Sequence, residues 1–198
     1  MVNSTPSRRD QILLALAEML ESSPHSRITT ARLAQHLQVS EAALYRHFPS
    51  KAKMYDGLLD FVEDSLFSRV RTILETESSA EDHCHGIVLL LLGFCERNPG
   101  ISRILAGDAL IGENQRLHSR ANQILDRLET QLKQVLREAE VRENKRTVLT
   151  ITDTANMLIA LAEGKIRQYV RSNFNRLPTE KWAPQWQMLE GRLFRNHP

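Results

Sequence analysis

The sequence has few cysteines, glycines and prolines, and it lacks a long apolar run. It contains two cysteines, eight glycines and seven prolines in 198 residues. Its longest uncharged apolar run extends from Gly86 to Cys95, whereas a membrane-spanning helix needs about 20 such residues. The first residues include no apolar stretch of the kind found in secretory signal peptides. We therefore expect a cytoplasmic protein without a membrane segment.

The two cysteines and the histidines beside them predict neither a disulfide bond nor a metal site. Cys84 and Cys95 lie in one predicted helix, about 16 Å apart along its axis, and a disulfide bond requires Cα atoms within about 7 Å. His83 and His85 flank Cys84, but adjacent positions on a helix point in different directions. We expect no bound metal and no cofactor.

Signatures of catalysis are also missing. Gly107 and Gly112 have the spacing of a phosphate-binding loop, but Glu113 follows where such a loop needs lysine. The seven histidines are scattered and form no metalloprotease signature. We expect that the protein is not an enzyme.

The composition is that of a globular protein with a basic N-terminal region. The sequence is 41% hydrophobic and 25% charged, with a net charge of +2. Residues 1–54 contain seven Lys or Arg and four Asp or Glu, whereas the remainder contains 19 basic and 20 acidic residues. A basic region on a nearly neutral body suits nucleic acid, although this excess alone is a weak indication.

Apolar residues recur at helical spacing along nearly the whole chain, and no segment alternates as a strand does. Glycine and proline are sparse, and some of them punctuate these segments; Asn98, Pro99 and Gly100, for example, are expected to end a helix. We therefore predict an all-α protein, with the charged run 142–146 as an exposed loop. The predicted helices are 8–21, 29–37, 41–48, 51–75, 82–97, 102–106, 113–138, 150–172 and 184–194.

The segment from Ile28 to Lys51 predicts two short helices joined by a tight turn. Thr29 and Ser40 are suited to cap the two helices, because their hydroxyls can accept hydrogen bonds from free backbone amides. Ala34 is small, as a close crossing of the helices requires. This arrangement is typical of a helix-turn-helix unit, whose second helix reads the major groove of DNA.

The second helix of this unit has a buried and an exposed side. Leu44 and Phe48 are predicted to point inward, which leaves Glu41, Ala42, Ala43, Tyr45 and His47 outside. The two alanines would allow a close approach to base edges, while Tyr45, His47 and Lys51 carry donors for phosphates. The alternative is a helical hairpin whose polar face is simply solvated.

The residues LAQHLQVSEAALYRHFPSK resemble the helix-turn-helix of TetR-family regulators, whose pattern ends in Leu-Tyr-x-His-Phe-x-x-Lys. Gln38 departs from the pattern, because the family usually has glycine in the turn. A left-handed backbone at this residue would cost about 1–2 kcal/mol. The resemblance implies a three-helix DNA-binding head in residues 1–50 and a helical regulatory and dimerisation domain in residues 51–198.

The same resemblance implies a homodimer that binds palindromic double-stranded DNA. The family dimerises mainly through its last two long helices, here 150–172 and 184–194. Ala160 and Gly164 are small enough for a second helix to pack closely there. Operator symmetry mirrors the symmetry of such a dimer.

A closer resemblance extends over most of the chain. The segments RITTARLA, VSEAALYRHFPSK, FVEDSL and IVLLLLGFCERNPG are similar to the nucleoid occlusion factors of gamma-proteobacteria, a branch of the TetR family. This implies a nucleoid-associated protein that, when bound to DNA, binds the division protein FtsZ and blocks Z-ring assembly over the chromosome. It also implies a higher assembly on DNA, with more than one dimer at a site. The alternative is a ligand-responsive TetR-type repressor with a pocket in its C-terminal domain.

The resemblance also implies which residues form the two surfaces. DNA contacts are expected from Thr29, Thr30, Ala42, Ala43, Tyr45, His47 and Lys51. Partner contacts are expected from Phe61, Arg69, Leu90, Gly93, Arg97 and Asn98. By spacing alone, Leu90, Gly93 and Arg97 form one helical stripe, which could be a shallow groove for an acidic, apolar peptide. Alternatively, Gly93 only makes room for a neighbouring helix.

Overall fold

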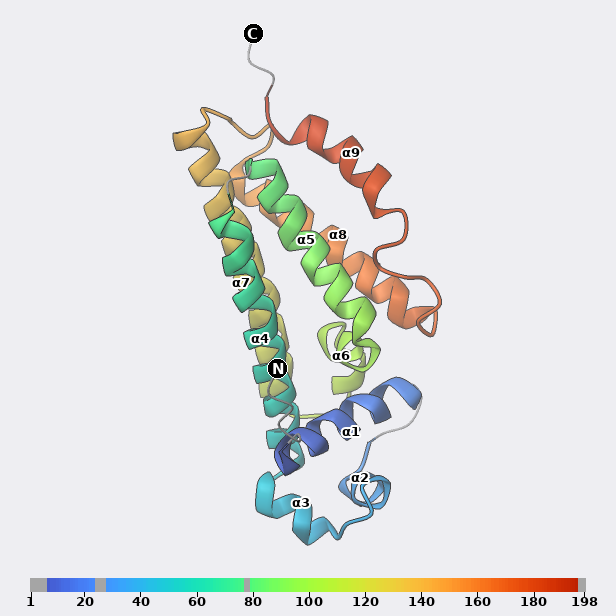
Figure 1. Cartoon of the computed structure of the whole chain (residues 1–198). Coiled ribbons are helices and arrows are strands. Elements are labelled where there is room, and N and C mark those ends of the chain that lie inside the picture. The colour runs from blue at the N-terminus through green and yellow to red at the C-terminus, as the bar shows by residue number, and fades with distance from the viewer. Residues whose placement is uncertain (1–6, 24–27, 77–78, 196–198) are drawn as a thin grey trace. The chain divides into compact units, whose positions relative to one another are not determined.

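The computed structural model describes residues 7–23, 28–76 and 79–195. These residues form helices and contain no strand beyond a single bridge between Thr147 and Phe194 (Figure 1). The predicted all-α fold is thus confirmed for the part of the chain that is described. The helices are α1 (Arg8–Ser22), α2 (Thr30–His36), α3 (Glu41–His47), α4 (Lys51–Glu75), α5 (Ala80–Arg97), α6 (Pro99–Leu105), the 3-10 turn η1 (Asp108–Leu110), α7 (Gln115–Arg142), α8 (Ile151–Arg171) and α9 (Trp182–Leu193).

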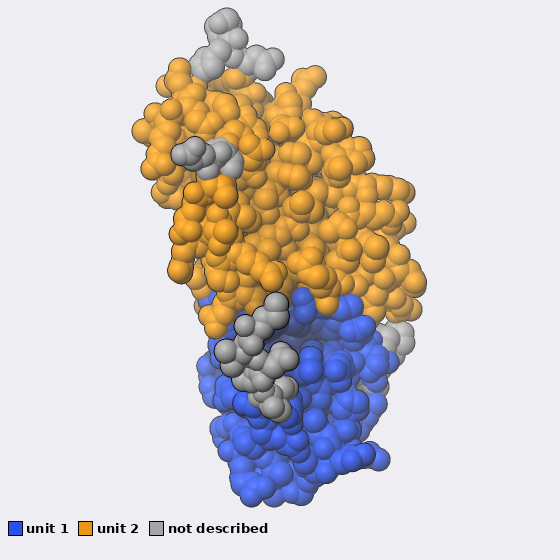
Figure 2. Space-filling view, viewed as in Figure 1, with its two compact units in different colours: residues 1–63, 98–121 blue, residues 64–97, 122–198 orange. Residues whose placement is uncertain are grey.

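The chain forms two compact units (Figure 2). The head unit comprises residues 1–63 and 98–121, and the body unit comprises residues 64–97 and 122–198. The head unit thus contains α1, α2 and α3, the first half of α4, α6, η1 and the start of α7. We retain the division into a DNA-binding domain (1–50) and a regulatory domain (51–198) as a proposal.

Helix α1 supplies much of the core of the head unit. It begins with a capping box, in which the Asp10 backbone N–H donates to Ser7 Oγ (3.2 Å) and the Ser7 N–H donates to Asp10 Oδ2 (3.0 Å). Its buried stripe includes Ile12, Leu16 and Leu20, which recur every four residues. This stripe gives α2, α3 and α6 a common apolar surface to pack against.

Helix α6 lies directly against α1, an arrangement absent from the sequence-based expectation. Asn98, Pro99 and Gly100 do follow the end of α5, but Pro99 and Gly100 are already the first residues of α6. Proline is favoured at this position because its missing N–H would have no partner there. A Cβ at Gly100 would lie 2.1 Å from the carbonyl oxygen of Ala17, so only glycine permits this close packing.

A buried arginine completes the contact between α6 and α1. Arg103 is 5% exposed, and its Nη1 donates to the carbonyl oxygen of Leu20 at the end of α1 (2.8 Å). Its Nε donates to Asp108 Oδ2 at 2.5 Å. Because the charge is both paired and hydrogen-bonded, it is tolerated in the interior, and it ties α6 to the helix on which α2 and α3 rest.

The body unit is built around the apolar helix α5. Ile87, Leu91 and Leu92 are buried, and Tyr169 of α8 donates from its hydroxyl to the carbonyl oxygen of Glu96 at 3.1 Å. Helix α7 extends beyond the predicted end to Arg142. The predicted exposed loop 142–146 is confirmed for Glu143, Asn144 and Arg146, whereas Arg142 still belongs to α7. Lys145 is half-buried and pairs with Glu81 and Glu143.

Candidate DNA-binding and partner surfaces

Helices α2 and α3 both have the predicted N-caps, and the turn between them contains a residue with a left-handed backbone. Thr29 Oγ1 accepts from the Arg32 backbone N–H, and Ser40 Oγ accepts from that of Ala43, both at 3.2 Å. Gln38 has a left-handed backbone, with φ of 54°. The position thus has the conformation for which glycine is best suited, although this chain has glutamine there.

Helix α3 has the buried and exposed sides that the sequence predicts. Leu44 is 0% and Phe48 is 1% exposed, while Ala42, Tyr45 and His47 are exposed and Ala43 is half-buried. The guanidinium of Arg9 covers the outer face of the Phe48 ring, with its Cζ 4.3 Å from the ring centroid. Small side chains and hydrogen-bond donors therefore share the outer surface of a well-anchored helix.

A hydrogen-bonded chain crosses from α2 to α3 on this outer surface. The Thr30 hydroxyl donates to Glu41 Oε2 at 2.6 Å, and the Tyr45 hydroxyl donates to Thr30 Oγ1 at 3.3 Å. Two expected DNA residues, Thr30 and Tyr45, are thus brought together. Glu41, which was not among the expected contacts, holds them. Sequence reasoning missed this link because it joins positions on separate helices.

Lys51 is held by a carboxylate inside the head unit. Its Nζ donates to Glu113 Oε1, and the two side chains are 20% and 11% exposed, respectively. The same Nζ lies 5.6 Å from the centroid of the Tyr55 ring. Lys51 is expected to donate to a flanking phosphate, and in this structure its ammonium is paired with Glu113 instead.

Further ion pairs join α4 to the start of α7 in the head unit. Asp56 contacts Lys53 Nζ at 3.0 Å and both Arg116 and Arg120 at 3.5 Å. Burial by itself would raise the pKa of Asp56, but the Lys53 hydrogen bond and the three cationic charges outweigh burial and lower it. Arg120 also pairs with Asp60 at 2.9 Å. These contacts give α4 a defined position in the head unit.

The expected partner residues are divided between the units. Arg69, Leu90, Gly93 and Arg97 belong to the body unit, whereas Phe61 and Asn98 belong to the head unit. Phe61 is 49% exposed, an unusual environment for a phenylalanine. Asn98 is half-buried, and its carbonyl oxygen accepts from the Ser102 hydroxyl at 3.2 Å.

Within the body unit, the packing of α4 against α5 sets the register of the partner residues. A Cβ at Gly86 would lie 3.2 Å from Cγ2 of Ile73, so glycine allows the two helices to approach. The helices run in opposite directions (Figure 1). The residue one turn before Ile73 on α4 therefore lies level with the residue one turn after Gly86 on α5. These residues are the exposed Arg69 and the half-buried Leu90.

Gly93 is not needed for close contact with a neighbouring helix. The three atoms nearest to a Cβ built at Gly93 all belong to the Arg97 guanidinium, the closest being Nη1 at 3.3 Å. Arg97 is exposed and folds back over this bare stretch of backbone. The stripe thus presents an apolar residue, a stretch of helix backbone that has no side chain of its own, and a cation that lies over this backbone.

Helices α8 and α9 share a partly apolar, accessible face in the body unit. Leu161 is 40% and Met188 is 70% exposed, and a Cβ at Gly164 would meet no atom within 4 Å. A shallow cavity of about 330 Å³ lies on this face, lined by Ala160, Leu161, Gly164, Lys165, Gln168, Trp182, Gln185, Met188 and Leu189.

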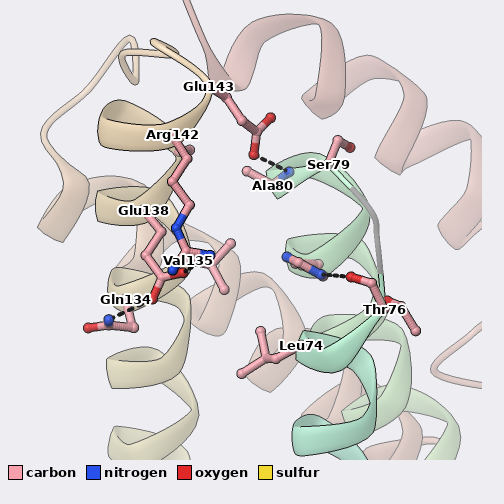
Figure 3. Close-up of a pocket in the computed structure, with 11 residues that line it drawn as sticks. Leu74, Thr76, Ser79, Ala80, Gln134, Val135, Glu138, Arg142 and Glu143 are labelled. Atoms are coloured by element: carbon pink, nitrogen blue, oxygen red, sulfur yellow. Dashed lines mark hydrogen bonds and ion pairs between the residues drawn. The ribbon is translucent and has the colours of Figure 1, made fainter.

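A larger cavity of about 640 Å³ lies in the body unit between the end of α4, the start of α5 and the end of α7 (Figure 3). Its carboxylates already have protein partners. Glu138 accepts from Gln134 at 2.8 Å and pairs with Arg142 at 3.4 Å. Glu143 accepts from the Ala80 N–H at 3.1 Å. The cavity is therefore lined by polar side chains whose carboxylates are engaged by neighbouring residues of the lining.

The side chains of the histidine–cysteine run have separate environments. Cys84 is 0% exposed, and burial raises the pKa of its thiol to about 12. His83 Nε2 lies 3.4 Å from the Thr76 carbonyl oxygen. His85 stacks on Trp186 with a centroid distance of 4.9 Å, and its pKa is lowered by burial. Along the described ranges, no three metal-binding side chains gather at one point.

None of the described helices combines the length and the apolar character needed to cross a membrane. The longest apolar sequence belongs to α5, which is interrupted by charged residues near both ends, at Glu81, Asp82, Glu96 and Arg97. The buried side of α5 instead forms the core of the body unit.

Comparison with protein families matches both parts of the chain. Residues 12–58 match the family of bacterial regulatory proteins named tetR. Residues 82–194 match the SlmA-like family, described as a tetracyclin repressor-like C-terminal domain. The second match covers more than half of the chain and includes α5, the expected partner stripe and the α8–α9 face.

Curated relatives match over nearly the full length. The nucleoid occlusion factor SlmA of Marinomonas sp. is 55% identical over 196 residues, covering 99% of this chain and 100% of the relative. The factor of the same name from Idiomarina loihiensis is 53% identical over 193 residues, covering 98% of each chain.

Solved structures support the fold. The fatty acid degradation regulator FadR of Bacillus halodurans has a TM-score of 0.79 at 16% identity, covering 96% of this chain and 97% of that one. The ketosteroid regulator KstR2 of Mycobacterium tuberculosis has a TM-score of 0.75 at 19% identity, covering 98% of each chain. At these identities the likeness concerns the fold alone. Together with the full-length relatives, it places the chain in the TetR family and, within it, among the SlmA nucleoid occlusion factors.

Proposed function

We propose that this protein binds palindromic DNA as a homodimer and, in the DNA-bound state, binds FtsZ and disrupts its polymers over the nucleoid. The observation that carries this proposal is the 53–55% sequence identity to nucleoid occlusion factors, which extends over nearly the full length and therefore through the body unit. The proposed activity is one of binding, and it assigns no chemical step to this chain.

The proposed DNA surface is the outer side of α2 and α3. Ala42 and Ala43 would lie against base edges, while Thr29, Thr30, Tyr45, His47 and Lys51 would contact the flanking phosphates. Support comes from the exposure of α3 and from its firm anchoring by Leu44 and Phe48. Lys51 would have to leave or share its Glu113 pair to reach a phosphate. Thr30 and Tyr45 would likewise have to turn their single hydroxyl hydrogens away from Glu41 and Thr30.

The proposed dimer interface is the shared face of α8 and α9. Exposed Leu161 and Met188 would be removed from water by a second copy, and Gly164 would let the backbones approach. A two-fold interface presents the same face from each protomer. Two heads related by this symmetry would contact the two halves of a palindrome.

The proposed FtsZ surface in the body unit comprises Arg69, Leu90, Gly93 and Arg97. Two arginines flank an apolar residue and a glycine whose backbone only the flexible Arg97 side chain covers, which suits an extended peptide with acidic and apolar side chains. Phe61 and Asn98, in the head unit, are proposed as partner residues from the resemblance alone.

The decisive experiment is sedimentation of GTP-assembled FtsZ with this protein, with and without a palindromic duplex selected by the protein from a random pool. Loss of pelleted polymer that requires the duplex is the expected result. An unchanged pellet under both conditions, with DNA binding intact, would refute the FtsZ proposal and favour a ligand-responsive repressor.

Reversing the charge of either arginine on the proposed FtsZ surface tests whether this surface is distinct from the proposed DNA surface. Arg69→Glu and Arg97→Glu should each abolish the effect on FtsZ while leaving DNA affinity within about two-fold, since rim charges act mainly on their own partner. Arg71→Glu is the matched control, because Arg71 is an exposed arginine two positions along α4 and therefore on another side of the helix. Equal loss of DNA binding and FtsZ inhibition would contradict the assignment.

A further inference from the structure

A carboxylate lies in the middle of the proposed DNA surface. Glu41 is exposed and is the first residue of α3. Its Oε2 accepts the Thr30 hydroxyl at 2.6 Å, and Thr30 Oγ1 in turn accepts the Tyr45 hydroxyl at 3.3 Å. The acid thus stands at the accepting end of a hydrogen-bonded chain made by two residues proposed to contact phosphates.

A negative charge in this place opposes binding to DNA as such. Duplex DNA carries about one phosphate charge per 1.7 Å of its axis, and this charge supplies most non-specific affinity for cations. An ionised carboxylate repels phosphates, and docking removes part of its water. Unless it finds a donor on the DNA, Glu41 weakens binding to every sequence alike.

The major groove offers such donors only at particular bases. An ionised carboxylate can accept hydrogen bonds but cannot donate them. Adenine presents its N6 amino group beside the N7 acceptor, whereas cytosine presents its N4 amino group without an acceptor on the same base edge. An acceptor-only side chain therefore fits cytosine better than adenine, and it fits neither guanine nor thymine.

We infer that Glu41 is a specificity-determining residue that accepts a hydrogen bond from the N4 amino group of one cytosine in each half-site. The inference rests on the proposed docking of α3 in the major groove. Ala42 and Ala43 follow Glu41 directly, and their short side chains leave room for the carboxylate to reach a base edge. Thr30 holds the carboxylate in place, which reduces the entropy lost on binding.

The test measures affinity of the full-length protein for a set of duplexes over a range of salt concentrations. The set contains the selected palindrome, variants in which each base pair of the half-site, C·G or A·T, is replaced symmetrically, and an unrelated duplex. For the unmodified protein we expect one C·G position whose replacement weakens binding about ten-fold, the size expected for one base contact.

Glu41→Ala should remove the discrimination at that position while strengthening binding to the unrelated duplex several-fold, because a charge that repels phosphate is gone. Glu21→Ala is the matched control, since it removes one exposed acid of the head unit from α1 instead of α3. The control should leave discrimination at every position unchanged.

Glu41→Gln gives a second and independent readout. An amide can pair with both N6 and N7 of adenine, so this variant should prefer an A·T pair at the position where the unmodified protein prefers C·G. If Glu41→Ala binds every duplex more weakly and to the same extent, Glu41 only holds Thr30 in position, and the inference is overturned. Discrimination lost at an A·T pair instead would also overturn it. An unmodified protein that distinguishes no duplex would refute the DNA-reading proposal itself.

Discussion

The guanidinium of Arg97 covers the backbone of Gly93, so that a Cβ added at Gly93 would lie 3.3 Å from Nη1 of Arg97. The nearest atoms to this position all come from that flexible side chain, in contrast with Gly86, where the nearest atoms belong to Ile73 of α4. Gly93 therefore has no packing role toward another helix that would explain it. We propose that its role is in the surface that Arg97 and Leu90 share with it.

Gly93→Ala should stabilise the fold and weaken the binding of FtsZ. Alanine is favoured over glycine inside a helix by about 0.5–1 kcal/mol, and the Arg97 side chain can move aside. The new methyl group occupies the place of the guanidinium over the backbone and displaces it, so FtsZ inhibition should fall at least several-fold. Chemical denaturation and FtsZ sedimentation measure the two effects. Destabilisation together with normal inhibition would contradict this role.

Glu113→Gln should strengthen DNA binding. In the present structure Glu113 neutralises Lys51, and the two side chains are mostly buried. Removing the negative charge frees the ammonium to neutralise a phosphate, so affinity should rise several-fold and its dependence on salt should steepen. Fluorescence anisotropy at several salt concentrations checks both. Lys51→Gln combined with Glu113→Gln should lose this gain. Weaker binding by Glu113→Gln alone would mean that Glu113 is needed to position Lys51.

Thr29→Ala should weaken both the head unit and its binding to DNA. The Thr29 hydroxyl caps α2 by accepting from the Arg32 N–H at 3.2 Å, and loss of such a cap costs about 0.5–2 kcal/mol. The same change removes a proposed phosphate contact. Thr29→Ser keeps the hydroxyl and should retain both properties. Normal DNA affinity of Thr29→Ala, measured well below its melting temperature, would exclude Thr29 from the DNA surface.

Leu161→Glu should convert the dimer into monomers. Leu161 is 40% exposed on the α8–α9 face, and a second copy would bury the new carboxylate without a partner, which is unfavourable. Analytical ultracentrifugation at micromolar concentration measures the mass. Leu14→Glu is the control, since Leu14 is 58% exposed on α1 of the head unit. An unchanged dimer mass for Leu161→Glu would place the interface elsewhere.

Gln38→Gly should raise the free energy of unfolding by up to about 1 kcal/mol. The left-handed backbone at Gln38, with φ of 54°, is unfavourable for a residue with a Cβ, and this gain exceeds the extra chain entropy of glycine. Gln35→Gly is the matched control and should destabilise, because Gln35 is an exposed glutamine within α2, where glycine is unfavourable. Urea denaturation compares the two. Destabilisation by both variants to the same extent would show that Gln38 is not strained.

Much of the fold could be predicted from the sequence because its signals are local. The caps at Thr29 and Ser40 involve residues three positions apart, and the apolar stripes of the helices depend on spacings of three and four. The buried Leu44 and Phe48 follow from the same periodicity. Helix ends were less predictable: Pro99 and Gly100 signal an end to α5, but they equally suit the start of α6.

The sequence by itself thus determined an all-α chain, a capped helix-turn-helix and membership of the TetR family. Only the tertiary structure decided which side chains meet across elements: Lys51 with Glu113, 62 positions away, and Glu41 with Thr30, 11 positions away. It also decided the register of Gly86 against Ile73. The physical reason is that helical periodicity specifies which side of each helix is buried, whereas the partner and the register on that side depend on packing between elements.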